Sequence, residues 1–139
     1  MRVAFVSCVK TKSATPELAE QLYISPWFRM AREYARRNAD RWFILSAQHG
    51  LVEPGRLIAP YEATLNRMRV ADRQKWAARV IREIAEWDLR GTRAVVLAGQ
   101  NYREFLMNPL TARFDTVDVP MKGLQMGEQL SWMKNLLGG

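Results

Sequence analysis

Apolar positions along the chain follow two different periods. Four short runs rich in β-branched and other apolar residues have the length and composition of buried strands, at residues 2–6, 42–45, 93–98 and 114–119. Between these runs, apolar residues recur at the three- and four-residue spacing of a helix. The clearest example is the segment 71–89, in which one face carries Trp76, Val80, Ile84 and Trp87. Strands and helices are therefore expected to alternate.

Start signals and spacing predict four more helices. Thr15-Pro16-Glu17 and Ser25-Pro26 each offer an N-cap residue followed by a first-turn proline, which predicts helices over residues 15–23 and 25–38. Two further helices are expected over residues 101–112, with a break near Pro109 as an alternative, and over 124–137. The stretch 47–69 contains several glycines and prolines, so it is predicted to be irregular. Loops of that length inside a compact domain often carry function.

This alternation predicts a single α/β domain over residues 1–139. Its expected architecture is a small three-layer sandwich, in which a mainly parallel four-stranded sheet lies between two layers of helices. Ligands of such folds bind outside the carboxyl ends of the strands, near the point where the strand order reverses. The residues that follow each strand are therefore the first candidates for a functional site.

The charge balance points to an anionic partner. The 139-residue chain has a formal net charge of +7, and most of its 21 basic residues are arginines. Nucleic acid or a nucleotide is the commonest partner of such a protein, although a solvated basic surface would have the same composition. Four arginines crowd the predicted helix 25–38, where they either form a solvated face or contact phosphates: Arg29, Arg32, Arg36 and Arg37.

The sequence argues against several classes of protein. No apolar run reaches the roughly 18 residues that span a membrane, and the N-terminus lacks a signal-peptide pattern, so we expect a cytoplasmic protein without membrane contact. The chain has one cysteine, Cys8, and one histidine, His49, which excludes an intramolecular disulfide, a thiolate zinc site and an all-histidine metal centre. We expect neither a metal nor a cofactor. The sequence does not determine the oligomeric state.

Small, polar and cationic residues follow the predicted strands. The candidates for substrate binding are Ser7 and Lys12 after the first strand, Ser46, Gln48 and Gly50 after the second, Gly99, Gln100, Asn101 and Tyr102 after the third, and Tyr23, Ser25 and Tyr61 in the connecting segments. Tyr102 could stack on a base or pack on a helix face. The segment that begins at Gly99 opens a predicted helix, whose backbone N–H groups could bind an anion.

His49 and Glu62 are the candidates for acid–base chemistry. Histidine titrates near neutral pH and can donate or accept a proton, and His49 follows a predicted strand beside Gly50, which permits a tight turn. Glu62 lies at the end of the long irregular segment and is the carboxylate expected to pair with His49. The alternatives are a histidine that only hydrogen-bonds its loop and an acid that only lies on the surface.

Lys10 and Cys8 are further catalytic candidates. Lys10 and Lys12 are expected to hold phosphate, and Lys10 could instead form a Schiff base if it were desolvated. Cys8 could be a nucleophile if a neighbouring cation lowered its pKa, although a free cysteine is most often a small buried apolar residue.

Five short motifs carry a resemblance to a known family. They are Cys8-x-Lys10, Leu22-Tyr23-x-Ser25-x-x-Phe28, Leu45-Ser46-Ala47-x-His49-Gly50-Leu51, Pro60-Tyr61-x-x-Thr64-Leu65 and Gly99-x-x-Tyr102. Together they resemble a family of small bacterial and phage proteins of unknown function. That family is in turn similar, more distantly, to the lyase-associated domain of archaeosine synthase and to the uracil-DNA glycosylase-like fold. This likeness implies a four-stranded parallel sheet that binds a nucleobase at its strand ends.

The chain departs from the glycosylase pattern at two places. Ser7-Cys8-Val9-Lys10 stands where uracil-DNA glycosylases have their water-activating Asp motif, and Val119-Pro120-Met121 stands where they have a His-Pro-Ser motif. The resemblance therefore implies a fold and a nucleobase pocket, and any chemistry falls to His49, Glu62 and Lys10.

Three functions are compatible with these features. The first is an enzyme that processes a nucleobase or nucleotide, with cleavage of an N-glycosidic bond in DNA, RNA or a modified nucleotide as the expected reaction. The second is a non-catalytic module that binds nucleic acid or senses a nucleotide. The third is a hydrolase or transferase that depends on Cys8.

Overall fold

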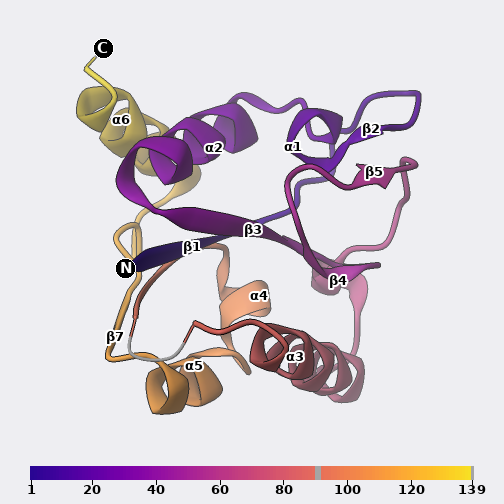
Figure 1. Cartoon of the computed structure of the whole chain (residues 1–139). Helices are drawn as coiled ribbons and strands as arrows, with labels where there is room; N and C mark the ends of the chain where they lie inside the picture. Colours follow the sequence, from indigo (N-terminus) through magenta and orange to yellow (C-terminus); the bar gives the residue numbers. More distant parts are fainter. Residues whose placement is uncertain (90–91, 139) are drawn as a thin grey trace.

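The computed structural model (Figure 1) describes residues 1–89 and 92–138. Its strands are β1 (Arg2–Ser7), β2 (Glu17–Leu18), β3 (Arg41–Ser46), β4 (Gly50–Val52), β5 (Leu57–Ile58), β6 (Arg93–Leu97) and β7 (Thr116–Asp118). Its helices are α1 (Ala19–Leu22), α2 (Pro26–Asn38), the 3-10 helix η1 (Leu65–Arg67), α3 (Val70–Ala85), α4 (Gln100–Arg103), α5 (Met107–Arg113) and α6 (Met126–Leu136). None of the helices described is long and apolar enough to cross a membrane.

The main sheet has five strands in the order β4-β3-β1-β6-β7. The pairs β3–β1, β1–β6 and β6–β7 are parallel, and β4 alone is antiparallel, at the edge beside β3. The alternation of strands and helices thus correctly predicts a mainly parallel α/β sheet. The expected number of four strands is wrong, because β4 falls inside the segment 47–69 that was expected to be irregular.

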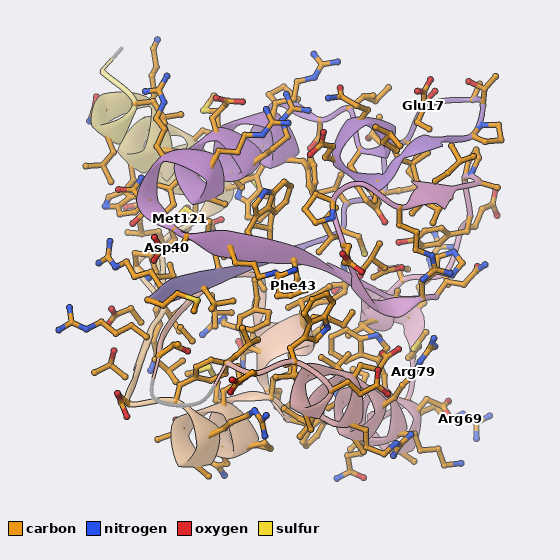
Figure 2. The ribbon with its side chains drawn as sticks, viewed as in Figure 1. Glu17, Asp40, Phe43, Arg69, Arg79 and Met121 are labelled. Atoms are coloured by element: carbon orange, nitrogen blue, oxygen red, sulfur yellow. The ribbon has the colours of Figure 1, made fainter. Side chains whose placement is uncertain are left out.

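Helices cover both faces of this sheet. In Figure 1, α2 and α6 lie together on one face, and α3, α4 and α5 lie on the other. Phe43 projects from β3 toward the α3 layer (Figure 2), where its ring lies 5.1 Å from the Trp87 ring and 6.0 Å from the Phe5 ring. Burial of these large apolar side chains stabilises the layers. The expected three-layer arrangement is therefore present.

Tertiary pairing replaces the first part of the helix expected over residues 15–23. Glu17 and Leu18 form the short strand β2, which pairs antiparallel with β5 of the long loop. The helix α1 begins only at Ala19, and the Thr15 hydroxyl lies near Ser13 and Glu17 without capping it. Strand pairing with a segment about 40 residues away overrides the local helix-start signal of residues 15–17. Local helix propensity does not account for contacts with distant segments.

The helix expected over residues 101–112 is split in two. The break between α4 and α5 precedes Pro109, which lies in the first turn of α5. Proline is tolerated there because the first backbone N–H groups of a helix have no intrahelical acceptor. Two other elements are shorter than expected: α3 ends at Ala85, and β7 covers only Thr116–Asp118.

Candidate functional site

A cleft opens between the carboxyl ends of β1 and β6. After β1 the chain leads to α2 on one face of the sheet, and after β6 it leads to α4 on the other face (Figure 1). The gap between β1 and β6 is therefore the switch point of the sheet, where ligands of such folds bind. The cleft has a volume of about 700 Å³. Its lining comes from Ser7, Cys8, Val9, Lys10, Lys12, Trp27, Tyr61, Glu62, Ala63, Thr64, Asn66, Arg67, Gly99, Tyr102, Met126 and Gln129.

Half of the lining comes from residues that the sequence singled out. These are Ser7, Cys8, Lys10, Lys12, Tyr61, Glu62, Gly99 and Tyr102. Gln100 lines an adjoining hollow of about 290 Å³, which shares Gly99 and Gln129 with the cleft. The remaining candidates do not line either space: Tyr23, Ser25, Ser46, Gln48, His49, Gly50 and Asn101.

A chain of buried hydroxyl groups lies beneath the cleft. Ser46, which is fully buried at the end of β3, donates a hydrogen bond of 2.7 Å to the Tyr61 hydroxyl. The Tyr61 and Tyr23 hydroxyls are 2.5 Å apart. Burial raises the pKa of both tyrosines above its usual range, so both phenols remain protonated. Ser46 and Tyr23 therefore act by positioning Tyr61, which reaches the cleft itself.

The turn from β3 to β4 is held from three sides. The Ser46 side chain accepts a hydrogen bond from the backbone N–H of His49 at 3.0 Å, and the Ser46 carbonyl accepts one from the Trp76 indole at 2.8 Å. Arg79 of α3, which lies close to β4 in Figure 2, donates to the carbonyl oxygens of Gln48 and His49, each at 3.0 Å. The Ser-Ala-x-His-Gly-Leu motif thus builds a rigid support under the cleft.

His49 contacts the same support. Its ring lies edge-on to the Tyr61 ring, with 5.4 Å between the ring centres. Burial lowers the pKa of His49, and the positive charges of Arg56 and Arg79 lower it further, so its ring is neutral at pH 7. Glu62 lines the cleft, whereas His49 does not.

Lys12 is a half-buried cation in the cleft lining. Its backbone forms an antiparallel bridge with Tyr23, and its Nζ lies 4.5 Å from the centre of the Tyr61 ring and 5.7 Å from that of Tyr23. Nζ donates a hydrogen bond of 3.3 Å to the Lys10 carbonyl. Burial lowers the pKa of Lys12, while nearby Cys8 and Glu62 act in the opposite direction. Lys10 and Arg67, in contrast, are exposed at the cleft.

Cys8 and Tyr102 meet inside the cleft, although they come from opposite sides of the switch point. The Cys8 Sγ lies 3.3 Å from the Tyr102 hydroxyl, which also accepts a hydrogen bond of 3.5 Å from the backbone N–H of Leu65. Burial raises the pKa of Tyr102, so this phenol is a neutral donor. Cys8 as a whole residue is 6% exposed, so it reaches the cleft only narrowly.

Other candidate residues have structural roles. Ser25 caps α2 by accepting a hydrogen bond from the Phe28 N–H at 3.1 Å. Asn101 accepts a hydrogen bond of 2.6 Å from Arg73 and donates one of 2.8 Å to Asn66, which fixes the η1 segment beside the cleft.

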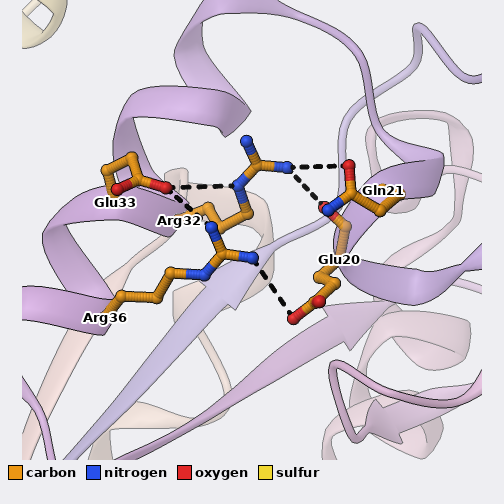
Figure 3. Close-up of polar contacts among 5 residues, drawn as sticks. All are labelled: Glu20, Gln21, Arg32, Glu33 and Arg36. Atoms are coloured by element: carbon orange, nitrogen blue, oxygen red, sulfur yellow. Dashed lines mark hydrogen bonds and ion pairs between the residues drawn. The ribbon is translucent and has the colours of Figure 1, made fainter.

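The arginines of α2 mainly hold helices together. Figure 3 shows that Arg36 contacts the carboxylates of both Glu20 and Glu33, at 3.4 and 2.7 Å, and that Arg32 donates to the Glu20 carbonyl at 2.8 Å. Arg37 donates to the carbonyl of Leu137, the C-cap residue of α6, at 3.1 Å. These contacts tie α2 to α1 and α6. The basic residues that line the cleft are Lys10, Lys12 and Arg67.

Several lining residues were missed by sequence reasoning. Trp27 donates a hydrogen bond of 2.8 Å to Gln129. The two residues are 102 positions apart, so no local sequence pattern predicts this contact. Asn66 and Arg67 belong to the long loop, whose length was the available signal. Over the ranges 1–89 and 92–138, no group of three or more His, Cys, Asp and Glu side chains could hold a metal ion.

Comparison with known proteins places the chain in a family. It matches the family of unknown function DUF6884 over residues 3–135, and it belongs to this family. It is also 30% identical over 118 residues to the uncharacterized protein YfjM of Bacillus subtilis (strain 168), a match that covers 76% of this chain and 74% of that protein. No solved structure matched the chain.

Proposed function

We propose that this family member is a nucleotide- or nucleobase-processing enzyme, and that it cleaves an N-glycosidic bond in DNA, RNA or a modified nucleotide. The observation that supports this proposal is the composition of the cleft at the strand switch point. Glu62 supplies a carboxylate there, Lys12 a half-buried amine, and Lys10 and Arg67 exposed cations.

These groups match the demands of the reaction. Cleavage of an N-glycosidic bond develops positive charge on the sugar and negative charge on the departing base. The Glu62 carboxylate suits the first charge, and the Tyr102 hydroxyl suits the second. Lys10 and Arg67 suit the phosphates, because a guanidinium or ammonium group at a cleft edge binds phosphate without being buried.

The aromatic residues of the cleft suit the base. Trp27, Tyr61 and Tyr102 all line it, and aromatic faces stack on nucleobases with little dependence on their identity. The resemblance of the sequence to the uracil-DNA glycosylase-like fold points the same way, because that fold binds a nucleobase at the carboxyl ends of a parallel sheet. We therefore also propose that the partner is nucleic acid or a nucleotide.

The experiment is a screen for released base. The protein is incubated with single- and double-stranded DNA and RNA oligonucleotides that carry normal or modified bases, and with free nucleotides, and released bases are identified by mass spectrometry. Glu62→Gln is expected to abolish release while it retains binding. Glu53→Gln, which removes an exposed acid outside the cleft, is the matched control and is expected to be fully active.

Two other functions are supported by particular observations. The exposed Lys10 and Arg67 would serve equally in a non-catalytic module that binds nucleic acid, which predicts salt-sensitive binding with no product from any substrate. The Cys8 thiol in the cleft would serve in a Cys8-dependent hydrolase or transferase. If alkylation of Cys8 by a small reagent leaves the activity intact, that last function is excluded.

A further inference from the structure

We infer that Lys12 is an amine nucleophile that forms an imine with an aldehyde in the cleft, and that its substrate is the ring-opened sugar of an abasic nucleotide. The choice of substrate rests on the proposed function. Cleavage of an N-glycosidic bond leaves a sugar whose C1′ carbon exists partly as an open-chain aldehyde, and an aldehyde is the partner with which a neutral lysine reacts.

The Lys12 side chain is held in place at both ends. Its backbone is fixed by the bridge with Tyr23, which is flanked by hydrogen bonds from Ser13 N–H to the Leu22 carbonyl at 2.8 Å and from Ile24 N–H to the Thr11 carbonyl at 3.1 Å. Its Nζ is fixed by the Lys10 carbonyl and by the face of the Tyr61 ring. A nucleophile positioned in this way loses little conformational freedom when it reacts.

The amine has no ion-pair partner to keep it protonated. Within the part of the chain that the structure describes, no carboxylate oxygen lies within 4.0 Å of Nζ. Burial lowers the pKa of Lys12, and Cys8 and Glu62 oppose this effect only in part. A lysine with a lowered pKa has a larger neutral, nucleophilic fraction than a solvated lysine at the same pH.

The other two basic residues of the cleft, Lys10 and Arg67, suit binding and not covalent chemistry. Lys10, for which the sequence offered a Schiff base as an alternative to phosphate binding, is exposed and therefore solvated, as is Arg67. These two cations suit the phosphates on either side of an abasic sugar. Lys12 is half-buried over the tyrosine rings, a position that suits contact with the sugar carbon better than contact with a hydrated phosphate.

The reaction balances without a redox partner. Nζ adds to C1′, and one of its hydrogens passes to the aldehyde oxygen. That oxygen takes a second proton from solvent and leaves as water, so a protonated imine forms, and hydrolysis of the imine later returns the proton. The Glu62 carboxylate in the same cleft then takes a proton from C2′. The electron pair of that C–H bond forms the C2′–C3′ double bond, and the C3′–O bond breaks, so that the 3′ phosphate leaves with the bonding pair. Water hydrolyses the imine, which releases an unsaturated aldehyde and regenerates Lys12.

The test is reductive trapping. The full-length protein is mixed with an oligonucleotide that contains one aldehydic abasic site, sodium borohydride is added, and the covalent adduct is measured on a denaturing gel and located by peptide mass spectrometry. We expect an adduct on Lys12 that is lost in Lys12→Arg and in Lys12→Met. Lys134→Arg, an exposed lysine on α6 outside the cleft, is the matched control and is expected to trap as the original protein does.

The possible results separate this inference from the proposed function. An adduct on Lys10, on the N-terminal amine or on another lysine overturns the inference, as does the absence of any adduct from protein whose folding is verified by circular dichroism. If trapping fails while base release persists, only the inference is wrong. If Lys12 is trapped but no base is released from any substrate, the inference stands and glycosidic cleavage is wrong. Unchanged trapping in both Lys12 variants also overturns the inference that Lys12 is the nucleophile.

Discussion

The Ser46 hydroxyl donates a hydrogen bond to the Tyr61 hydroxyl inside the protein, and this contact connects the most distinctive motif of the sequence to the cleft. Ser46 ends β3, whereas Tyr61 lies on the long loop and presents its ring to the Lys12 amine. The motif that contains the only histidine therefore contributes to the site by positioning Tyr61. His49 itself lies beside Tyr61 and outside the cleft lining.

Replacement of Ser46 by Ala is expected to destabilise the protein. The substitution leaves the Tyr61 hydroxyl and the His49 N–H without their Ser46 partner at a buried position. A buried polar group that loses its partner costs about 1–3 kcal/mol, so we expect a loss of that size in urea unfolding. Ser131→Ala, on an exposed position of α6, is expected to change the stability by less than about 0.5 kcal/mol. Equal stability of the two variants would contradict the supporting role of Ser46.

Replacement of Gly50 by Ala tests the β3–β4 turn. Gly50 has φ +73°, in the left-handed region, and an added Cβ would overlap the Glu83 carboxylate that accepts a hydrogen bond of 3.1 Å from the Leu51 N–H. The backbone conformation alone costs an L residue about 1–2 kcal/mol, and displacement of Glu83 adds to this. Gly55→Ala, where the added methyl meets open space, is the control in the same unfolding measurement. A Gly50 variant as stable as the control would show that the turn adapts freely.

The stability of the protein is expected to fall in acid partly because of His49. Its pKa in the folded state lies below the value of 6.5 for an exposed histidine, because of burial and of Arg56 and Arg79. As the pH falls through 6.5, the unfolded chain takes up a proton before the folded protein does, which favours unfolding. Thermal unfolding between pH 7.5 and 5 is expected to show a smaller decrease for His49→Gln than for the original protein. Parallel curves for the two proteins would contradict this assignment.

The exposed cations of the cleft are expected to set the salt dependence of nucleic-acid binding. Each cation that contacts a phosphate contributes about one unit to the slope of log affinity against log salt concentration. Lys10→Ala and Arg67→Ala are each expected to weaken oligonucleotide binding and to reduce this slope by about one unit. Lys134→Ala removes the same charge from α6 and serves as the control. A control that changes the slope as much as the cleft variants would indicate binding by net charge alone.

Local patterns in the sequence determined much of the framework. The strands β1, β3 and β6 and the helices α2, α3 and α6 lie where apolar periodicity predicted them, because their buried residues recur at the spacing of a strand or a helix. The mainly parallel order of the sheet followed from their alternation. The same reasoning directed attention to the carboxyl ends of the strands, where the cleft opens beside Cys8, Lys12 and Tyr102.

Only the tertiary structure decided which of the candidate residues share a space. Lys10 and Lys12 look alike in the sequence, yet the Lys12 amine lies over the rings of Tyr23 and Tyr61, whereas Lys10 is exposed. The strands β2 and β4 arose from pairing with distant or reversing segments, and the Trp27–Gln129 contact joins opposite ends of the chain. Exposure, charge and reactivity depend on what other parts of the chain cover a side chain, and that covering is not a local property of the sequence.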